Sequence, residues 1–227
     1  MNSDAKVLFV GCFNLGPEAA IAFGERFPNF EYALWKRGDD VGKKAIRDRI
    51  LLGEWDVLVS FYNDYIFSAE ELEQFRLKIN IHPSLVRGRG YDTMPLIRDE
   101  ETHGIMLHFV TEEIDFGSII QVVEAEIPKE ISYRDFRRKN QLLCLDMLRS
   151  IADTMNAEQS VESLISHYEN EASVLNRPWG DEYISATYLG KTLRALRKTN
   201  PNHRVFEGLP EEIVQYRPRK TSATPVS

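Results

Sequence analysis

The alternation of short apolar runs with helical patterns over the first 82 residues constrains the fold more than any other feature of this chain. Strand-length apolar runs lie at 6–11, 31–35, 56–62 and 78–82. Helical patterns lie between them, at 17–27, 43–52 and 68–75. Such alternation is typical of βαβ units, whose parallel strands are covered by helices on both faces. We therefore predict an α/β fold with a Rossmann-like, mostly parallel sheet.

The second half of the chain adds further elements and then changes character after Asn176. We expect two strands and two helices there, at 104–110, 118–127, 133–155 and 157–168. Residues 176–183 are turn-like, and 185–198 has the pattern of a basic amphipathic helix with Ser185 as its N-cap. The predicted organisation is one main domain over 1–176, a small C-terminal extension over 177–215 and a disordered tail over 216–227.

Charge and hydropathy exclude several classes of protein. The formal net charge is -7 at pH 7, so the surface as a whole repels the phosphates of nucleic acid. No run approaches the roughly 18 apolar residues that a membrane-spanning helix needs. The first eleven residues lack the charged and long apolar segments of a secretory signal. We expect a cytoplasmic protein that binds neither nucleic acid nor membranes.

General catalytic motifs are missing. The sequence contains no Walker A loop, no GxGxxG after the first strand, no GxSxG elbow and no HExxH. His103 and His108 lie five residues apart along one expected strand, where they would point to opposite faces. We therefore expect no metal site.

Three polar residues fall where an α/β sheet places its chemistry, at the carboxyl ends of the strands. The two-residue period of a strand puts Asn80 and His82 on one face, and Asp115 lies in the polar turn at 111–117. An amide and a protonated imidazole can stabilise an oxyanion, while a carboxylate can orient the imidazole or relay a proton. From spacing alone, the alternative is structural: an Asn in a turn and a His that binds a backbone carbonyl.

The same residues belong to a pattern that resembles the catalytic core of the folate-dependent formyltransferases. NIHPSL at 80–85 matches the Asn-x-His motif of that family, and IDFG at 114–117 matches its Asp-x-Gly turn. The run THGIMLHFVTEEIDFGSIIQ at 102–121 is especially similar to the glycinamide ribonucleotide branch, and the close resemblance covers 56–125. It implies transfer of a formyl group from N10-formyltetrahydrofolate to an amine. Asn80 and His82 would stabilise the oxyanion, and Asp115 would support His82 and help carry the amine proton to the folate nitrogen.

The resemblance also implies two walls for the pterin of the donor, which would bind through backbone groups. The first wall follows the third strand and contains Asn63, Tyr65, Ile66 and Phe67. The second wall is the turn that contains Val110, Thr111, Glu112, Glu113 and Asp115. The alternative for Ile66 and Phe67 is that both belong to the core.

The acceptor is less constrained. The turn GCFNLG at 11–16 lacks the Ser/Gly-rich phosphate loop of the glycinamide ribonucleotide branch, which counts against purine biosynthesis. Methionyl-tRNA formyltransferases carry a C-terminal β-barrel, for which the 51 residues at 177–227 offer little room. A small amine remains, and the resemblance favours a dTDP- or GDP-linked amino-dideoxyhexose. Candidate acceptor contacts are Arg87 and Arg89 for a diphosphate and Tyr91 and Trp179 for stacking, although the arginines could equally belong to a solvated loop.

Other functions and the oligomeric state stay open at this point. The rivals are a phosphoribosylglycinamide formyltransferase with an unusual phosphate loop, a formyltetrahydrofolate hydrolase and a non-catalytic folate-binding module. A homodimer could form through the basic helix after Ser185 or the long helix from Tyr133, and the sequence does not choose between them.

Overall fold

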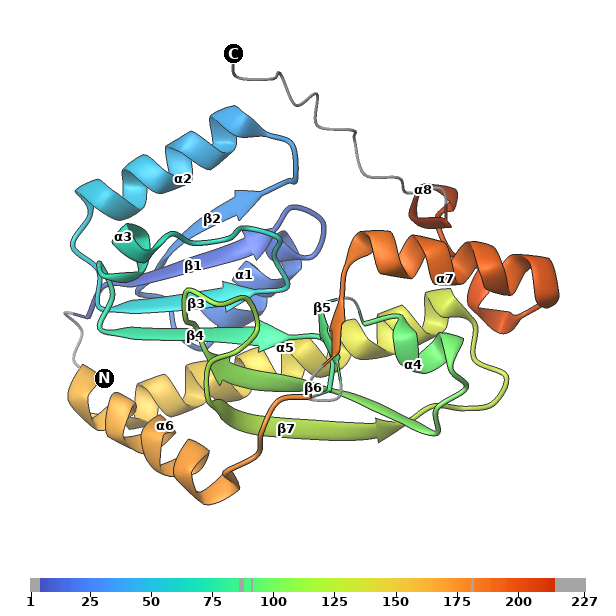
Figure 1. The fold of residues 1–227 in the computed structure, drawn as a ribbon. Helices are drawn as coiled ribbons and strands as arrows, with labels where there is room; N and C mark the ends of the chain where they lie inside the picture. Colours follow the sequence, from blue (N-terminus) through green and yellow to red (C-terminus); the bar gives the residue numbers. More distant parts are fainter. Residues whose placement is uncertain (1–4, 86–87, 91, 181, 215–227) are drawn as a thin grey trace, which may run out of the picture.

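A six-stranded sheet with the order β2-β1-β3-β4-β6-β7 forms the centre of the molecule (Figure 1). The computed structural model describes residues 5–85, 88–90, 92–180 and 182–214 of the 227-residue chain. The strands of this sheet are β1 (Val7–Cys12), β2 (Glu31–Trp35), β3 (Val57–Phe61), β4 (Leu77–His82), β6 (Thr102–Phe109) and β7 (Ile119–Glu126). The first four are parallel, and β6 and β7 are each antiparallel to their neighbours. The prediction of a mostly parallel α/β sheet is confirmed.

Helices cover both faces of this sheet because its central strands are apolar on both sides. Phe9, Val59 and Ile79 point to the face packed by three helices, α1 (Gly16–Gly24), α5 (Tyr133–Ala157) and α6 (Val161–Leu175). Leu8 and Leu58 point to the opposite face, packed by α2 (Asp40–Leu52) and α3 (Ala69–Leu72). Figure 1 shows α2 and α3 on one side of the sheet and the long α5 on the other.

The antiparallel strand β6 determines how the loop at 110–118 reaches the rest of the sheet. Met106 lies opposite His82, and Phe109 lies opposite Ile79, so β6 ends beside the first half of β4. The Val110 N–H then donates to the Lys78 carbonyl at 2.9 Å. From there the loop must fold back over the sheet to bring any side chain near His82.

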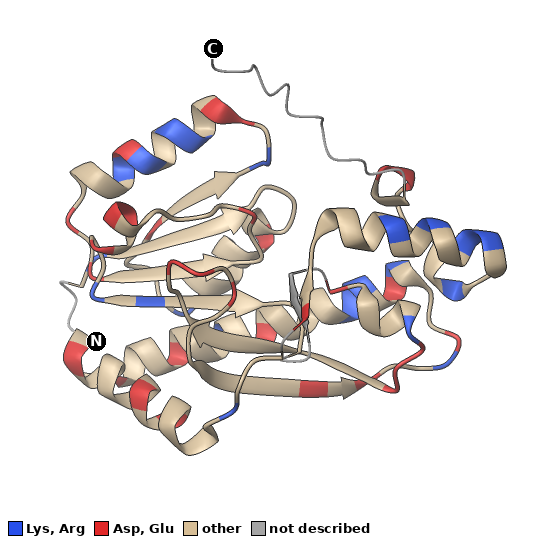
Figure 2. Ribbon diagram, viewed as in Figure 1, with Lys and Arg blue, Asp and Glu red and all other residues tan. Residues whose placement is uncertain are grey.

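The C-terminal segment packs against the chain instead of forming a separate layer. It comprises β8 (Glu182–Ile184), α7 (Ala186–Thr199), a 3-10 helix (Arg204–Phe206) and α8 (Glu211–Val214). Leu189 and Leu193 of α7 are buried against α4 (Met94–Ile97) and the start of α5. Lys and Arg residues lie along α7 (Figure 2). Because its apolar stripe is buried within the chain, α7 presents charged groups at the surface.

Several expectations for individual elements were met, and others were wrong. Ser68 and Glu71 form the predicted capping box, and Ser185 caps α7. Helix α6 begins at Val161, not at 157, because Ser160 caps it. The segment expected to be turn-like contains β8, which pairs with β5 (Gly88–Gly90). The predicted tail at 216–227 lies outside the described residues.

The described residues include no helix that combines the length and the apolar character needed to cross a bilayer.

Candidate active site

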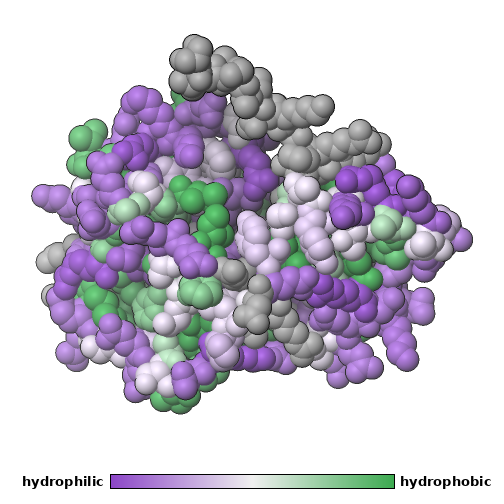
Figure 3. Space-filling view, in the orientation of Figure 1, coloured by the Kyte–Doolittle hydropathy of each residue, from purple (hydrophilic) through white to green (hydrophobic). Residues whose placement is uncertain are grey.

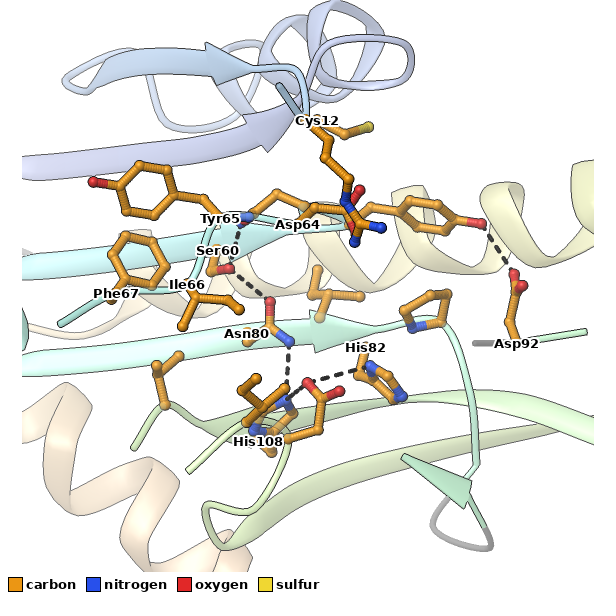
Figure 4. A pocket seen from close by; sticks show the side chains of 18 of the residues that line it. Cys12, Ser60, Asp64, Tyr65, Ile66, Phe67, Asn80, His82, Asp92 and His108 are labelled. Carbon is orange, nitrogen blue, oxygen red and sulfur yellow. Dashed lines mark hydrogen bonds and ion pairs between the residues drawn. The ribbon is translucent and has the colours of Figure 1, made fainter. Parts of the chain in front are cut away.

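A cavity of about 340 Å³ lies where β1, β3 and β4 end. It reaches Cys12 at the end of β1, Tyr62 after β3 and Pro83 after β4. Figure 4 shows Asn80 and His82 projecting from β4, with Ser60 of β3 beside Asn80. The volume is near the lower end of the roughly 300–1,000 Å³ typical of ligand pockets, so the cavity suits the reacting part of a large ligand.

The Asn80 carboxamide is fixed by hydrogen bonds on both of its polar atoms (Figure 4). The Ser60 hydroxyl donates to Asn80 Oδ1 at 2.7 Å, and Asn63 Nδ2 donates to Ser60 Oγ at 2.7 Å. Asn80 Nδ2 lies 2.9 Å from Nε2 of His108. An amide nitrogen carries two N–H groups, so His108 takes one and the second is left for another acceptor.

His108 is held in the neutral tautomer that can accept from Asn80. Its Nδ1 donates to the Phe109 carbonyl at 2.7 Å, which leaves Nε2 unprotonated and able to accept. Burial, with a smaller electrostatic effect from the neighbouring His82, lowers the pKa of His108 to about 4. At neutral pH this imidazole is therefore an uncharged acceptor for the Asn80 amide.

His82 faces the carboxylate of Asp115. Asp115 Oδ1 lies 3.5 Å from His82 Nδ1 and 3.9 Å from His108 Nε2, so the carboxylate sits between the two rings. The His82 side chain is 5% exposed, and its Nε2 is buried without a hydrogen-bond partner. The geometry thus brings the three predicted residues together at one cavity.

The turn that carries Asp115 depends on two unusual backbone positions. Asp115 has φ of 49°, in the left-handed region where Asp is more common than most residues. A Cβ on Gly117 would lie 1.9 Å from the Phe109 carbonyl oxygen, so only glycine fits there. These features allow the loop to fold back over the sheet.

Trp179 braces this turn from the C-terminal segment. Its Nε1 donates to the Gly117 carbonyl at 2.7 Å. Its ring meets the His108 ring edge-on at a centroid distance of 5.0 Å and the His82 ring at 6.0 Å. The structure therefore places this predicted acceptor contact against the two histidines, and the cavity lining among the described residues does not include it.

The loop after β3 is built around Asn63 and Tyr65. Asn63 Nδ2 also donates to the Val10 carbonyl at 3.1 Å, and its Oδ1 accepts from the Tyr65 N–H at 2.6 Å. The Tyr65 hydroxyl binds the buried Glu71, and burial is the main cause of its raised pKa. Phe67 belongs to the core, which was the alternative considered for both Ile66 and Phe67, whereas the Ile66 side chain is 57% exposed. All four predicted residues of this wall line the cavity.

The opposite wall is formed by the loop at 110–115, all of whose residues line the cavity. The Thr111 hydroxyl donates to the Glu113 carbonyl at 3.0 Å, and Glu112 is exposed. Ile114 of this loop and Phe116, just after it, are 40% and 49% exposed. Figure 3 shows an apolar patch in the middle of the viewed face, surrounded by hydrophilic surface.

The end of the cavity near α5 contains a network around Asp92. The Tyr62 hydroxyl donates to Asp92 Oδ2 at 3.0 Å, and Asn140 Nδ2 donates to the same oxygen at 3.3 Å and to the Pro83 carbonyl at 2.6 Å. Arg137, one turn before Asn140 on α5, also lines the cavity. Its guanidinium lies 5.7 Å from the Tyr62 ring centroid.

Comparison with known proteins places this site in a family. Residues 15–143, more than half of the chain, match the profile of a family described as formyl transferase. The chain belongs to the formyl transferase family. The resemblance seen in the sequence is therefore confirmed at the level of the family.

Solved structures of other formyl transferases share the fold. The chain is similar to an N-formyltransferase from Helicobacter canadensis in complex with folinic acid and dTDP-3-aminofucose, with a TM-score of 0.56 and 15% identity over 81% of this chain and 73% of that one. A 4-N formyltransferase from Francisella tularensis has a TM-score of 0.56 and 20% identity, over 82% of this chain and 78% of that one. A phosphoribosylglycinamide formyltransferase from Campylobacter jejuni has a TM-score of 0.51 and 18% identity, over 64% of this chain and 94% of that one.

Sequence reasoning missed several residues of this formyl transferase site. Ser60, His108, Asp92 and Arg137 were not predicted as site residues, although each lines the cavity. In the sequence, His108 stands out only as a possible metal ligand. The period of β6 does place it on the face opposite His103, as predicted. Among the predicted acceptor contacts, Arg87 and Tyr91 lie outside the described residues, and only the backbone of Arg89, in β5, is described.

Proposed function

We propose that this formyl transferase is an N-formyltransferase that moves a formyl group from N10-formyltetrahydrofolate to the primary amine of a nucleotide-linked amino sugar. One observation carries the proposal: Asn80, His82 and Asp115 meet at one cavity, with Nδ1 of His82 3.5 Å from Asp115 Oδ1. Such a set of groups can stabilise a tetrahedral oxyanion and move a proton.

In the proposed reaction, the amine attacks the formyl carbon and forms a C–N bond while the carbonyl becomes an oxyanion. The second N–H of the Asn80 amide and an N–H on Nε2 of His82 donate to that oxyanion. Asp115 stabilises the protonated imidazole of His82. Collapse of the intermediate breaks the bond to N10 of the folate, and the amine proton passes to that nitrogen through Asp115 and water.

The donor would bind between the loop that contains Ile66 and the loop at 110–115. Both loops offer exposed apolar side chains, of Ile66 and Ile114, for the flat rings of a folate. Backbone N–H and C=O groups of these loops would pair with the polar edge of the pterin. Folinic acid and 5-formyltetrahydrofolate are named as ligands in two structures with this fold, which supports a folate donor here.

Two features favour an amino sugar over glycinamide ribonucleotide as the acceptor. The structures of sugar N-formyltransferases cover 81–88% of this chain, whereas the phosphoribosylglycinamide formyltransferase from Campylobacter jejuni covers 64%. The start of α1 also suits a phosphate poorly. Pro17 removes one backbone donor there, and Glu18 adds a negative charge to the first turn.

The proposal is tested by following tetrahydrofolate formation from N10-formyltetrahydrofolate. The acceptors are several dTDP- and GDP-linked amino sugars, glycinamide ribonucleotide and an amine-free control. We expect turnover that depends on an amino sugar. Turnover without an amine would indicate a hydrolase, turnover with glycinamide ribonucleotide alone would indicate the purine enzyme, and tight folate binding without any turnover would favour a binding module.

Variants of the three residues then test the mechanism. Loss of one donor from the oxyanion hole of a protease costs about 10²–10³ in kcat, so we expect Asn80→Ala to lose a factor of about that size. His82→Ala and Asp115→Asn should lose similar or larger factors while remaining folded. His167→Ala and Asp146→Asn are matched controls, since both residues lie on the outer surface of α6 and α5. A folded His82→Ala enzyme with near-normal kcat would contradict the mechanism.

A further inference from the structure

Two arginines among the described residues line the cavity, and they differ in how their charge is balanced. Arg37 forms an ion pair with Asp64 at 2.7 Å. Arg137 is half-buried and forms no ion pair with any carboxylate in the described part of the chain. Of these two arginines, Arg137 is therefore the one whose charge lacks a close anionic partner among the described residues.

The guanidinium of Arg137 is held in place by two tyrosines. It donates one hydrogen bond, to the Tyr133 hydroxyl at 2.8 Å, and lies against the Tyr62 ring. A guanidinium has five N–H groups, and no Arg137 nitrogen is both buried and unpaired in the described structure. The remaining donors are thus open to solvent within the cavity. The Asp92 carboxylate attracts Arg137 without forming an ion pair with it among the described residues, and its Oδ2 accepts hydrogen bonds from Tyr62 and Asn140.

The position of Arg137 relative to the sheet separates it from the proposed donor site. Tyr65 and Phe67 of the donor wall pack with α2 and α3 on one face of the sheet. Arg137 belongs to α5, which covers the opposite face. The cavity extends across the carboxyl ends of the strands, from one face of the sheet to the other. Asn80 and His82 line it together with residues from both sides. A ligand that reaches Arg137 therefore approaches the catalytic residues from the side opposite the folate.

We propose that Arg137 binds an oxyanion group of the acceptor and thereby orients its amine toward the formyl donor. The inference rests on the proposed function, which assigns the other side of the cavity to the folate. A planar guanidinium pairs with two oxygens of a phosphate or a carboxylate at once, so one arginine can fix both position and orientation. In a nucleotide-linked sugar this group is the diphosphate. Arg137 would thus hold phosphate groups that the start of α1, with Pro17 and Glu18, suits poorly.

Direct binding measurements test the proposal without requiring turnover. Isothermal titration calorimetry would compare dTDP and GDP with thymidine, guanosine and acetate as probes. The proteins are the wild type, Arg137→Gln, Arg137→Lys and Arg138→Gln. Arg138 is the matched control because it is adjacent in sequence but exposed, and it pairs with Glu18 at 3.2 Å.

We expect the wild type to bind one of the nucleoside diphosphates at least tenfold more tightly than the corresponding nucleoside. Arg137→Gln should abolish that difference, and Arg137→Lys should restore part of it, because lysine keeps the charge but not the planar fork. Arg138→Gln should match the wild type. Binding of acetate that depends on Arg137 in the same way would support the oxyanion site and show that the group it binds is a carboxylate.

Two results would overturn the inference: equal binding of every probe by the wild type and Arg137→Gln, or no binding of any probe to the wild type. Folate binding and the thermal unfolding midpoint of Arg137→Gln show whether the variant is folded, and Arg137→Lys serves if it is not. If the wild type is active and Arg137→Gln leaves the KM of the acceptor unchanged, the inference about Arg137 is wrong while the proposed function stands. If probe binding depends on Arg137 but the protein never transfers a formyl group, the proposed function is wrong while the oxyanion site stands.

Discussion

The carboxamide of Asn80 and the imidazole of His108 are joined by a 2.9 Å hydrogen bond across the β4–β6 pair. The direction of this bond is fixed, because His108 Nδ1 already donates to the Phe109 carbonyl. A residue of one strand therefore determines which way the amide of the other strand presents its N–H groups.

We predict that His108→Phe lowers kcat while leaving the protein folded. The phenylalanine ring fills the same space but cannot accept from Asn80, and an unpaired buried polar group costs about 1–3 kcal/mol. If that loss falls on the transition state, kcat drops about fivefold to 150-fold. His108→Gln keeps an acceptor and should recover part of the rate.

The control for this prediction is His103→Leu, which changes the histidine on the other face of β6 and should leave kcat unchanged. Steady-state kinetics with both substrates would show the split between kcat and KM. Unchanged kcat in His108→Phe would mean that Asn80 does not need His108 for its orientation.

Stability should fall in mildly acidic solution because two histidines are buried in the neutral form. Burial lowers the pKa of both His103 and His108 to about 4, below the value of about 6.5 in an unfolded chain. Between these two values the unfolded chain binds protons that the folded chain does not. The free energy of unfolding is therefore retained above pH 6.5 and decreases as the pH falls toward 4, by up to about 1.4 kcal/mol per pH unit for each histidine.

Urea unfolding from pH 4.5 to 7.5 measures this effect. His103→Leu should be more stable relative to the wild type at pH 4.5 than at pH 7.5, since the leucine never takes up a proton. Stability curves of the two proteins that run parallel over this range would show that His103 is not the titrating group.

Gly117→Ala should disturb the turn that presents Asp115. The added methyl group would meet the Phe109 carbonyl 1.9 Å away, and overpacking of this kind costs about 1–3 kcal/mol. The turn must move to relieve the contact, so kcat should fall as well. Gly38→Ala is the control: it has φ of 89° and an open surrounding, and should lose stability but retain kcat. Full activity in Gly117→Ala would show that the turn tolerates displacement.

Trp179→Phe tests whether this residue braces the turn or contacts the acceptor. The variant keeps an aromatic ring against the histidines but removes the hydrogen bond to the Gly117 carbonyl. A brace would affect kcat with every acceptor, whereas a stacking contact would raise only the KM of the acceptor. We expect the first result because the Trp179 N–H is already committed within the chain.

The sequence predicted the first half of the fold well because its signals are local. Strands β1 and β3 are nearly continuous apolar runs, and caps such as Ser68 mark the helix starts. The three-residue strands β5 and β8 were missed, since three residues show no periodicity and their pairing joins segments far apart in the chain.

The candidate site was predictable to a different degree for each residue. Strand period placed Asn80 and His82 on one face, and the structure shows the same. Asp115 approaches His82 only because the loop folds back over the sheet, and no spacing rule indicates that. Arg137 lies on a helix whose pattern marks it as polar, but its position in the cavity depends on how α5 docks.

The hydrogen bond from Trp179 to Gly117 joins residues 62 positions apart and has a consequence for the order of assembly. The turn that carries Asp115 is synthesised well before the tryptophan that holds it. On a ribosome, the sheet and both histidines can therefore emerge while their aromatic cover is still inside the exit tunnel. A nascent chain stalled before Trp179 would expose an incomplete pocket to the cell.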